Sequence, residues 1–156
     1  MRFPWQKYGI LEGEEIDLKE ERMIRPTSFN DNVREVFYGI FLHGGNEKIG
    51  ECDLRVGMND ELYYAGNIGY RIYERWRGHS YAFQACRLLL PEAFHKYGMD
   101  EVIITCSPDN IPSRRTLEKL RGTFVEEIGV PSWHWLYKRG ETVKRIYRFR
   151  EGSQVV

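Results

Sequence analysis

The hydrophobic pattern of this 156-residue chain changes its period at Gly78. Before Gly78, apolar and polar residues alternate, so that Ile68, Tyr70 and Ile72 share one face of an expected strand. After it, apolar residues recur every three or four positions, which predicts a helix from Ser80 onward. Because strand patterns come both before and after this helical segment, the chain is expected to adopt an α/β fold.

Turn residues divide the rest of the chain into further strands and helices. Strands are expected over residues 16–24, 35–43, 48–56, 63–73, 102–106, 124–128 and 143–149, and helices over residues 80–97 and 111–120. Pro91 is expected to kink or restart the first helix, because proline lacks a backbone donor. Residues 1–15 are expected to form a loose N-terminal arm. No repeat or linker interrupts the pattern, so residues 1–156 are expected to form one domain with a mixed α/β sheet.

Composition excludes several classes of protein. Lys+Arg and Asp+Glu are both 23, and this neutral balance argues against a general nucleic-acid binder. No apolar run approaches the length of a membrane span, and the first residues lack the apolar region of a signal peptide. Cys52, Cys86 and Cys106 are far apart and have no ligand partners at metal-binding spacing. We therefore expect a cytoplasmic protein with buried thiols, no metal, and neither nucleic-acid nor membrane partners.

The loop of residues 74–78, between the expected strand and helix, suits a diphosphate. A helix N-terminus presents N–H groups without intrahelical partners and carries partial positive charge. Gly78 lets the backbone approach an anion, and Ser80 adds a small hydroxyl donor. Arg75 and Arg77 add positive charge, and further basic residues fall on elements near this loop: Arg71, Arg87, Arg114, Arg115 and Lys119. The alternative is an ordinary strand-to-helix turn with solvated arginines, and the spacing matches neither a P-loop nor a dinucleotide loop.

Two motifs resemble those of the GNAT superfamily of N-acetyltransferases. Residues 68–82 are similar to the family's acetyl-CoA motif, (Gln/Arg)-x-x-Gly-x-(Gly/Ala), in which Arg75 and Gly78 match and Ser80 departs. Residues 109–120 resemble the family's Asn-x-x-Ser…Glu-Lys-x-Gly helix. The resemblance covers roughly residues 48–128. It implies a GNAT-like acyl-CoA-binding fold, with a central, mostly antiparallel sheet, a splayed parallel pair and flanking helices.

The resemblance also implies acetyl-CoA as co-substrate and a set of residues that hold it. The implied set is Ile72, Tyr73, Arg77, Gly78, His79, Ser80, Tyr81, Asn110 and Ser113. Backbone amides of residues 77–81 would hold the pyrophosphate, and the main chain of residues 72–73 would pair with the pantetheine arm like an added strand. Asn110 and Ser113 would contact the arm from the other side. Asn110 is alternatively only the cap of the helix that follows it.

Proton transfer is less defined by the sequence. Relatives usually acylate an amine directly, which requires a base or a water relay to remove a proton. Many carry an acidic residue or His just before the Ile-Gly-Tyr segment, where this chain has Asn67, which we expect to position a water. Glu51 and Asp53 share a strand face and are candidate bases, unless that face is simply solvated. The tyrosine that often protonates the leaving thiolate is replaced by Leu117.

Three further side chains are candidates. Tyr70 and Tyr147 are considered as acids, although packing roles suit them better. His134 lies between two tryptophans and is either part of a surface loop or a lid over the acceptor amine. No helical pattern precedes Glu35, where many relatives have two helices. The acceptor site is therefore expected to be open, or to be completed by a second subunit in a homodimer.

The favoured function is transfer of an acetyl group from acetyl-CoA to a small-molecule or peptide primary amine. One alternative is a non-catalytic acyl-CoA-sensing module of the same fold. A second alternative is a nucleotide-binding or structural domain without affinity for CoA.

Overall fold

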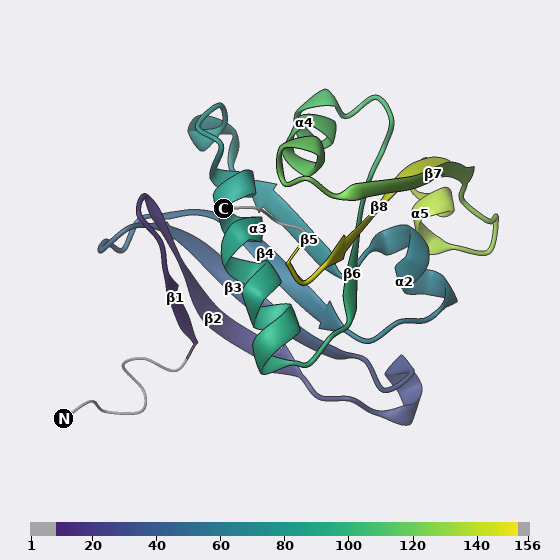
Figure 1. Ribbon diagram of the computed structural model, residues 1–156, viewed down its shortest axis with the longest axis horizontal. Helices are drawn as coiled ribbons and strands as arrows, with labels where there is room; N and C mark the ends of the chain where they lie inside the picture. Colours follow the sequence, from purple (N-terminus) through teal and green to yellow (C-terminus); the bar gives the residue numbers. More distant parts are fainter. Residues whose placement is uncertain (1–8, 153–156) are drawn as a thin grey trace.

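The computed structural model describes residues 9–152, whose strands form two antiparallel sheets (Figure 1). The first sheet has the order β1-β2-β3-β4-β5, and the second has the order β6-β8-β7. The first sheet comprises β1 (Ile10–Glu12), β2 (Ile16–Ile24), β3 (Arg34–Leu42), β4 (Lys48–Val56) and β5 (Ile68–Ile72). The second comprises β6 (Glu101–Cys106), β7 (Thr123–Gly129) and β8 (Val143–Arg150).

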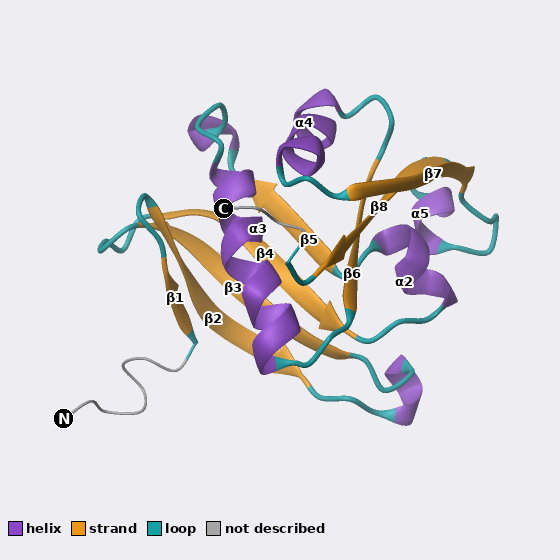
Figure 2. Ribbon diagram, viewed as in Figure 1, coloured by secondary structure: helices purple, strands orange, loops and turns teal. Residues whose placement is uncertain are grey.

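Short helices connect these strands (Figure 2). They are α2 (Asp60–Ala65), α3 (Tyr81–Pro91), α4 (Ile111–Lys119) and α5 (Trp135–Lys138), with 3-10 turns η1 (Ser28–Asn30) and η2 (Glu74–Trp76). Helix α3 lies across one face of the five-stranded sheet. No helix within the described residues is long and apolar enough to cross a membrane.

The period of two decides which face of β4 is buried. Cys52 and Leu54 point into the core that α3 covers, whereas Glu51, Asp53 and Arg55 lie on the opposite face. That opposite face has no long helix over it in Figures 1 and 2. Burial of one face by α3 therefore leaves a row of charged side chains on the other face.

The mixed α/β class is confirmed, and most of the expected strands are present. The hairpin of β3 and β4 turns at Gly44 and Gly45, as the sequence predicts. The prediction that residues 1–15 form a loose arm is wrong for residues 10–12, because these residues form β1 and pair with β2. Residues 1–8 of the arm lie outside the described residues.

The strand expected over residues 63–73 is wrong in its first half, which is part of α2. Asn59 accepts a hydrogen bond from the Leu62 amide at 2.8 Å and so caps this helix. The carboxylates of Asp60 and Glu61 lie in its first turn, where they interact favourably with the partial positive charge of the helix N-terminus. This capping signal outweighs the β-propensity of the two tyrosines that follow.

Helix α3 changes its hydrogen-bond pattern at Pro91, where a restart or kink was expected. The following residues, Glu92–Lys96, form a π-helical turn. Proline cannot donate to the preceding turn, which accounts for the change at this position. The segment ends at Gly98, whose φ of +64° suits glycine as a C-terminal cap.

The two sheets meet at the edge strands β5 and β6. The Asn67 amide donates to the Ile103 carbonyl at 2.6 Å, just before β5 begins. In Figure 1 the two strands then diverge. The paired ladders among the described residues are antiparallel. That β5 and β6 form a splayed parallel pair therefore stays a prediction. Their divergence opens a gap between the two sheets.

Asp17 ties together the turns at the far end of the first sheet. It is 5% exposed, and its carboxylate accepts hydrogen bonds from Gly13 N (3.1 Å), Gly44 N (2.9 Å) and His43 Nδ1 (2.8 Å). Burial raises the pKa of Asp17, but these hydrogen bonds outweigh it and hold the pKa below its ordinary value. The hydrogen bond to the Asp17 carboxylate, together with its negative charge, raises the pKa of His43.

We expect Asp17→Asn to lower the free energy of unfolding by about 1–3 kcal/mol, because the buried carboxylate and its charge-assisted hydrogen bonds are lost. The Asp17 contribution is present above its unfolded pKa of 3.8 and lost as pH falls through the lowered folded value. The His43 contribution is present below 6.5 and lost as pH rises through its raised value. The difference in the free energy of unfolding between wild type and Asp17→Asn, measured by urea unfolding, should therefore be larger at pH 5.5 than at pH 9. An equal difference at both pH values would show that the ion pair with His43 does not contribute to stability.

Candidate active site

A groove of about 670 Å³ opens between β5, the start of α3 and α4. The predicted cofactor residues that line it are Ile72, Arg77, Gly78, Ser80, Tyr81, Asn110 and Ser113. The structure thus brings together most of a set that is spread over more than forty positions of the sequence. Tyr73 and His79 do not belong to its walls, and the His79 ring stacks on Tyr81 instead.

The loop before α3 has the backbone that an anion site needs. Gly78 has a φ of +90°, and apart from Gly78 and its two chain neighbours no described residue has an atom within 4 Å of the place where a Cβ would be. Ser80 also has a left-handed backbone, with φ of 61°. This conformation explains why the family motif prefers a very small residue there. The first helical hydrogen bond of α3 runs from the Gln84 amide to the Ser80 carbonyl at 3.1 Å. The amides of residues 81–83 come before this bond in the first turn of the helix.

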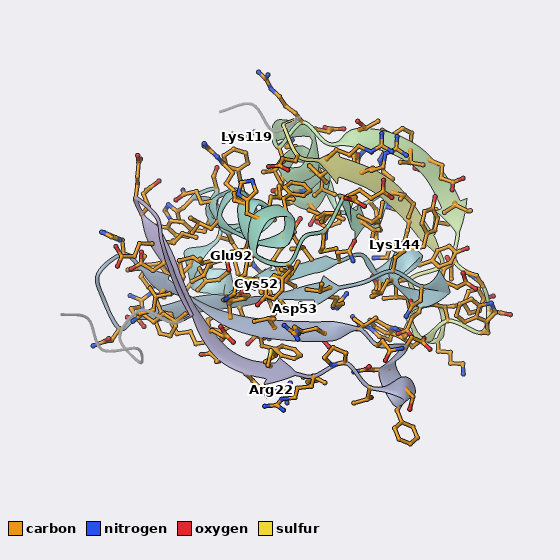
Figure 3. All side chains as sticks on the ribbon, turned by 60° about the horizontal axis from the view of Figure 1, so that its bottom comes forward. Arg22, Cys52, Asp53, Glu92, Lys119 and Lys144 are labelled. Carbon is orange, nitrogen blue, oxygen red and sulfur yellow. The ribbon has the colours of Figure 1, made fainter. Side chains whose placement is uncertain are left out.

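Only some of the basic residues that the sequence places near this loop line the groove. Arg77 lines the groove, but Arg75 does not, and its guanidinium lies 5.1 Å from the Trp76 ring centre. Arg115 and Lys119 line the opposite wall from α4, where a spacing of four residues places them on one helix face. Figure 3 shows Lys119 on that helix. Both are among the basic residues that the sequence places near this loop, although neither was predicted to hold the cofactor.

The backbone of β5 decides which groups face the gap. In an antiparallel pair, alternate residues bond to the neighbouring strand. Arg55 N donates to Asn67 O at 2.7 Å and Tyr73 N donates to Ile49 O at 2.9 Å, so the odd-numbered residues of β5 face β4. The even-numbered residues, Tyr70 and Ile72, face away from β4. The Tyr73 amide is therefore engaged with β4 and is not free to pair with the cofactor arm, while the pairing of Ile72 stays a prediction.

The Arg77 amide also needs a correction. It donates to the Glu74 carbonyl at 3.3 Å within the 3-10 turn, so it is not aimed at the groove. Its side chain is fixed by a hydrogen bond from Nε to the Ile72 carbonyl at 3.0 Å. Arg77 thus offers its guanidinium rather than its backbone to a ligand in the groove.

A second cavity of about 690 Å³ lies on the open face of the five-stranded sheet. It shares the residues Tyr70, Arg71, Asn110 and Ser113 with the groove. Asn110 caps α4, as predicted, by accepting a hydrogen bond from Ser113 N at 3.3 Å. A molecule in the groove and a molecule in the cavity would therefore meet beside the start of α4 and the middle of β5.

Tyr70 stands at this meeting point. Its hydroxyl is enclosed and makes no hydrogen bond among the described residues. Burial raises the pKa of Tyr70, and the Ser113 side chain partly offsets the rise. Tyr147 differs, because its hydroxyl accepts a hydrogen bond from Arg145 Nε at 3.0 Å and the residue is 1% exposed. Tyr147 and the buried Leu117 are thus packing residues.

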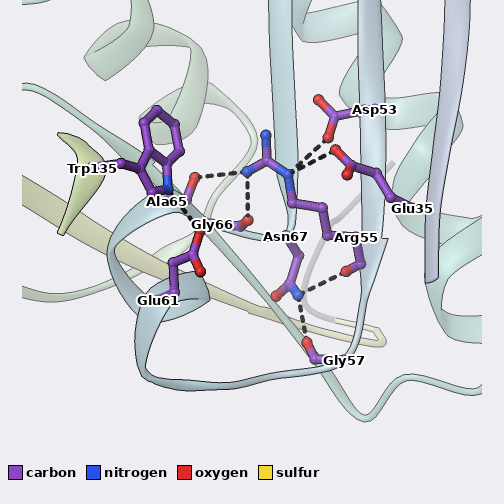
Figure 4. A network of polar contacts seen from close by, with 9 residues as sticks. All are labelled: Glu35, Asp53, Arg55, Gly57, Glu61, Ala65, Gly66, Asn67 and Trp135. Atoms are coloured by element: carbon purple, nitrogen blue, oxygen red, sulfur yellow. Dashed lines mark hydrogen bonds and ion pairs between the residues drawn. The ribbon is translucent and has the colours of Figure 1, made fainter. Parts of the chain in front are cut away.

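Carboxylates line the second cavity on β4. Glu51 is exposed, and its Oε1 lies 3.8 Å from Arg71 Nη1. Asp53 is enclosed, and its Oδ2 lies 2.9 Å from Arg55 Nε. Arg55 Nε is also 3.3 Å from Glu35 Oε2 (Figure 4). The predicted Glu51 is therefore at the cavity, but Asp53 is the carboxylate with the more unusual environment.

Asn67 and His134 have structural roles that the sequence did not reveal. The Asn67 side chain is 0% exposed, donates to the carbonyls of Arg55 (2.9 Å) and Gly57 (2.8 Å), and accepts from Ile103 N (2.8 Å). Figure 4 shows its two donated bonds. Its amide is thus engaged with three backbone groups, and the prediction that Asn67 positions a water at the site is wrong.

His134 is 1% exposed, so the predictions that it belongs to a surface loop or to a lid over the acceptor amine are wrong. Its Nδ1 accepts a hydrogen bond from Leu136 N at 3.0 Å, capping α5. Its Nε2 lies 2.9 Å from the Glu61 carbonyl and must donate to it, because a carbonyl oxygen only accepts. His134 therefore joins α5 to α2 as a neutral ring.

The thiols and possible metal ligands add no second reactive centre. Cys52, Cys86 and Cys106 are buried free cysteines, as expected. Burial raises the pKa of the Cys52 thiol, which makes it a weak nucleophile. Within residues 9–152, no group of three His, Cys, Asp or Glu side chains is arranged to hold a metal ion.

Comparison with known proteins agrees with this geometry. The acetyltransferase (GNAT) domain family matches residues 3–123. A probable GNAT-family acetyltransferase from Chromobacterium violaceum ATCC 12472 aligns with a TM-score of 0.66 at 13% identity, over 93% of this chain and 87% of that one. RimL, a ribosomal L7/L12 alpha-N-protein acetyltransferase solved in complex with coenzyme A, gives 0.65 at 13% identity, over 90% and 97%. No curated protein matches at the significance required.

Other solved structures are matched over a smaller share of their length. The microcin C7 self-immunity acetyltransferase MccE, solved with acetyl-CoA and AMP, gives a TM-score of 0.54 at 17% identity, over 79% of this chain and 63% of that one. The chain spans 61% of another probable acetyltransferase. These likenesses show the fold. The family match covers most of the chain, so the chain belongs to the GNAT acetyltransferase family.

Proposed function

We propose that this protein transfers an acetyl group from acetyl-CoA directly to a primary amine. The observation that carries the proposal is the junction of two cavities at Tyr70, Asn110 and Ser113. On one side is a cation-lined groove that ends on a helix N-terminus. On the other is a cavity whose charged lining consists of four carboxylates and five basic side chains, with Glu51 and Asp53 on its β4 wall, where an acceptor that arrives as an ammonium ion would meet them.

The groove fits the donor in charge and shape. Arg77, Arg115 and Lys119 offset the phosphate charges, and the first turn of α3 adds backbone donors for the pyrophosphate. The backbone of Tyr70 and Ile72 faces the gap in which the pantetheine arm would lie as an added strand. The enclosed hydroxyl of Tyr70 would donate to the thioester carbonyl or to the leaving sulfur.

The acceptor is a small-molecule or peptide amine. Among residues 9–34 the only helical element is the three-residue turn η1, so this part of the chain builds no helical wall over the cavity. We therefore also propose that a second copy of the chain covers the open side in a homodimer. Light scattering after gel filtration measures this directly, and a monomer at working enzyme concentration would contradict it.

Acetyl-CoA binding and thiol release together test the proposed function. Thermal shift should show stabilisation by acetyl-CoA and CoA and none by ATP. Free thiol should then appear with at least one amine of a panel that contains spermidine, L-lysine, kanamycin and a seryl tetrapeptide. No shift with acetyl-CoA well above a micromolar dissociation constant would contradict the proposal.

One observation favours a second candidate, a non-catalytic acyl-CoA sensor. The position of the family's tyrosine acid is the core residue Leu117, which is 0% exposed. Acetyl-CoA binding with no thiol release on any amine would support the sensor over the transferase.

A further inference from the structure

We propose that Asp53 is the catalytic base that takes the proton from the acceptor ammonium, and that Glu35 and Arg55 position it. This inference rests on the proposed function and assigns the proton acceptor that the sequence left open between Glu51 and Asp53. Three independent features of the structure carry it: the place of Asp53, the way its neighbours are fixed, and the charge around it.

The place of Asp53 follows from the strand register. Asp53 on β4 is paired with Gly69 on β5, next to Tyr70 at the cavity junction. A Cβ at Gly69 would lie 2.7 Å from Asp53 Oδ1, so the missing side chain is what makes room for the carboxylate over β5. Asp53 lines the acceptor cavity, and its side chain is 13% exposed. Asp53 and Tyr70 thus line the same cavity, where an amine bound near Tyr70 would lie close to this carboxylate.

Arg55 is held in place by more groups than Asp53 alone. Its Nη1 donates to the carbonyls of Ala65 (3.3 Å) and Gly66 (3.0 Å) at the end of α2. Its Nε lies between Asp53 and Glu35, as Figure 4 shows. A guanidinium anchored on backbone carbonyls holds both carboxylates in a defined place.

Two carboxylates facing one guanidinium leave an excess negative charge. Burial raises the pKa of Asp53 to about 7; the Arg55 charge opposes the rise, and the adjacent Glu35 adds to it. A base with a pKa near the working pH is the most effective general base. The other charged groups that face the cavity around Asp53 are Glu21 and Arg22 from β2, Glu51 from β4, Arg71 from β5, and Arg139, Glu141 and Lys144 from the opposite wall.

Several of these more distant groups are paired with one another. Glu21 binds Lys48 at 2.9 Å, and Glu51 lies near Arg71. Glu141 binds Lys144 at 2.7 Å and Arg139 at 3.2 Å. The charge that acts most directly on Asp53 thus comes from Glu35 and Arg55.

The proposed step balances as follows. Asp53 takes one proton from the acceptor R–NH₃⁺, and the neutral nitrogen attacks the thioester carbonyl carbon. The C–N bond forms, the C–S bond breaks, and the electron pair of that bond leaves with sulfur as a thiolate. The second nitrogen proton passes to the sulfur, which gives the amide and CoA thiol. Asp53 then releases its proton to water.

The first test is Asp53→Asn, which keeps the shape of the side chain. Its kcat is expected to fall roughly 10²- to 10⁴-fold at pH 7.5, and acetyl-CoA affinity is expected to remain at the wild-type value. A carboxyl whose pKa rises on folding from 3.8 to about 7 costs stability increasingly as pH passes through that window. The variant should therefore unfold at the same or a higher temperature than wild type at pH 8. The matched control is Asp100→Asn, an exposed aspartate in a distant bend, which should keep full activity.

The pH profile separates a base from a residue with a merely structural role. Wild-type kcat should rise through an apparent pKa near 7 as Asp53 loses its proton. Glu35→Gln removes a negative neighbour and should move this limb to lower pH by about 1 unit or more. Arg55→Gln removes the positive neighbour and should move it to higher pH, whereas Arg55→Lys keeps the charge and should restore the limb toward wild type.

The acceptor's own titration is distinguished by using two amines. A peptide α-amine, with a pKa of about 8, and an alkyl amine, with a pKa of about 10, should show the limb at the same pH if Asp53 produces it. A limb that follows the amine, or that survives unchanged in Asp53→Asn, overturns the assignment while leaving the transferase intact. Loss of the limb in Glu51→Gln instead would assign the role to Glu51. Failure of wild type to release thiol with any amine would overturn the proposed function and this inference with it.

Discussion

Reversing the charge at Arg77 and Lys119 together, as Arg77→Glu with Lys119→Glu, is expected to weaken acetyl-CoA binding roughly 100-fold or more. Each of these side chains lines the groove, from the α3 loop and from α4. A charge-assisted hydrogen bond to an anion contributes about 1.5–3 kcal/mol, and reversal replaces this with repulsion. Titration calorimetry or the thermal shift at a series of acetyl-CoA concentrations measures the loss.

The matched control is Arg75→Glu, which reverses a charge in the same loop but outside the groove. The guanidinium of Arg75 packs against Trp76, and the residue is exposed. We expect at most a several-fold weakening, through long-range charge that added salt screens. If Arg75→Glu weakens binding as strongly as the double variant, the groove is not where the cofactor phosphates lie.

Replacement of Asn67 by leucine is expected to lower the free energy of unfolding by about 3–5 kcal/mol, because three enclosed backbone groups would lose their partners. These groups are the carbonyls of Arg55 and Gly57 and the amide of Ile103. The side chain joins the edge of one sheet to the edge of the other at the point where they diverge. Loss of this link is therefore expected to reduce acetyl-CoA affinity as well.

Denaturant unfolding of Asn67→Leu, with acetyl-CoA affinity measured on the folded fraction, tests this expectation. Asn46→Leu in the exposed β3–β4 turn makes the same chemical change and should shift stability by less than about 0.5 kcal/mol. Asn67→Asp keeps the size but removes both donated hydrogen bonds, so it should also destabilise strongly. Wild-type stability in both Asn67 variants would show that the side chain is not the link between the sheets.

How far the sequence predicted the fold depends on which signals were local. The β3–β4 hairpin, the helix after Gly78 and the cap at Asn110 follow from period, turn residues and capping, which act within a few positions. The strand over residues 63–73 failed because its tyrosines favour β structure in isolation, whereas the Asn59 cap and acidic first turn start α2. The short β1 failed because a strand of three residues is defined by its partner β2 rather than by its own pattern.

The candidate site divides in the same way. Gly78 and Ser80 were found because a left-handed loop before a helix requires small residues that are visible in the sequence. Arg115 and Lys119 were counted among the basic residues near the loop but were not predicted to hold the cofactor, because that role depends on α4 lying across the groove from Arg77. Asn67 and His134 were misread because polar residues between apolar ones look functional until their backbone partners are known.

The sequence by itself determined the class of fold, the strand–loop–helix unit with its anion site, and the resemblance that made acetyl-CoA the expected donor. These follow from patterns along a continuous stretch of chain, where neighbours in sequence are neighbours in space. The tertiary structure alone decided that Asp53, Glu35 and Arg55 form one cluster, that Tyr70 stands where the two cavities meet, and that Asn67 joins the sheets. Those relations depend on strand register and on how two sheets diverge, which set distances between residues far apart in the chain.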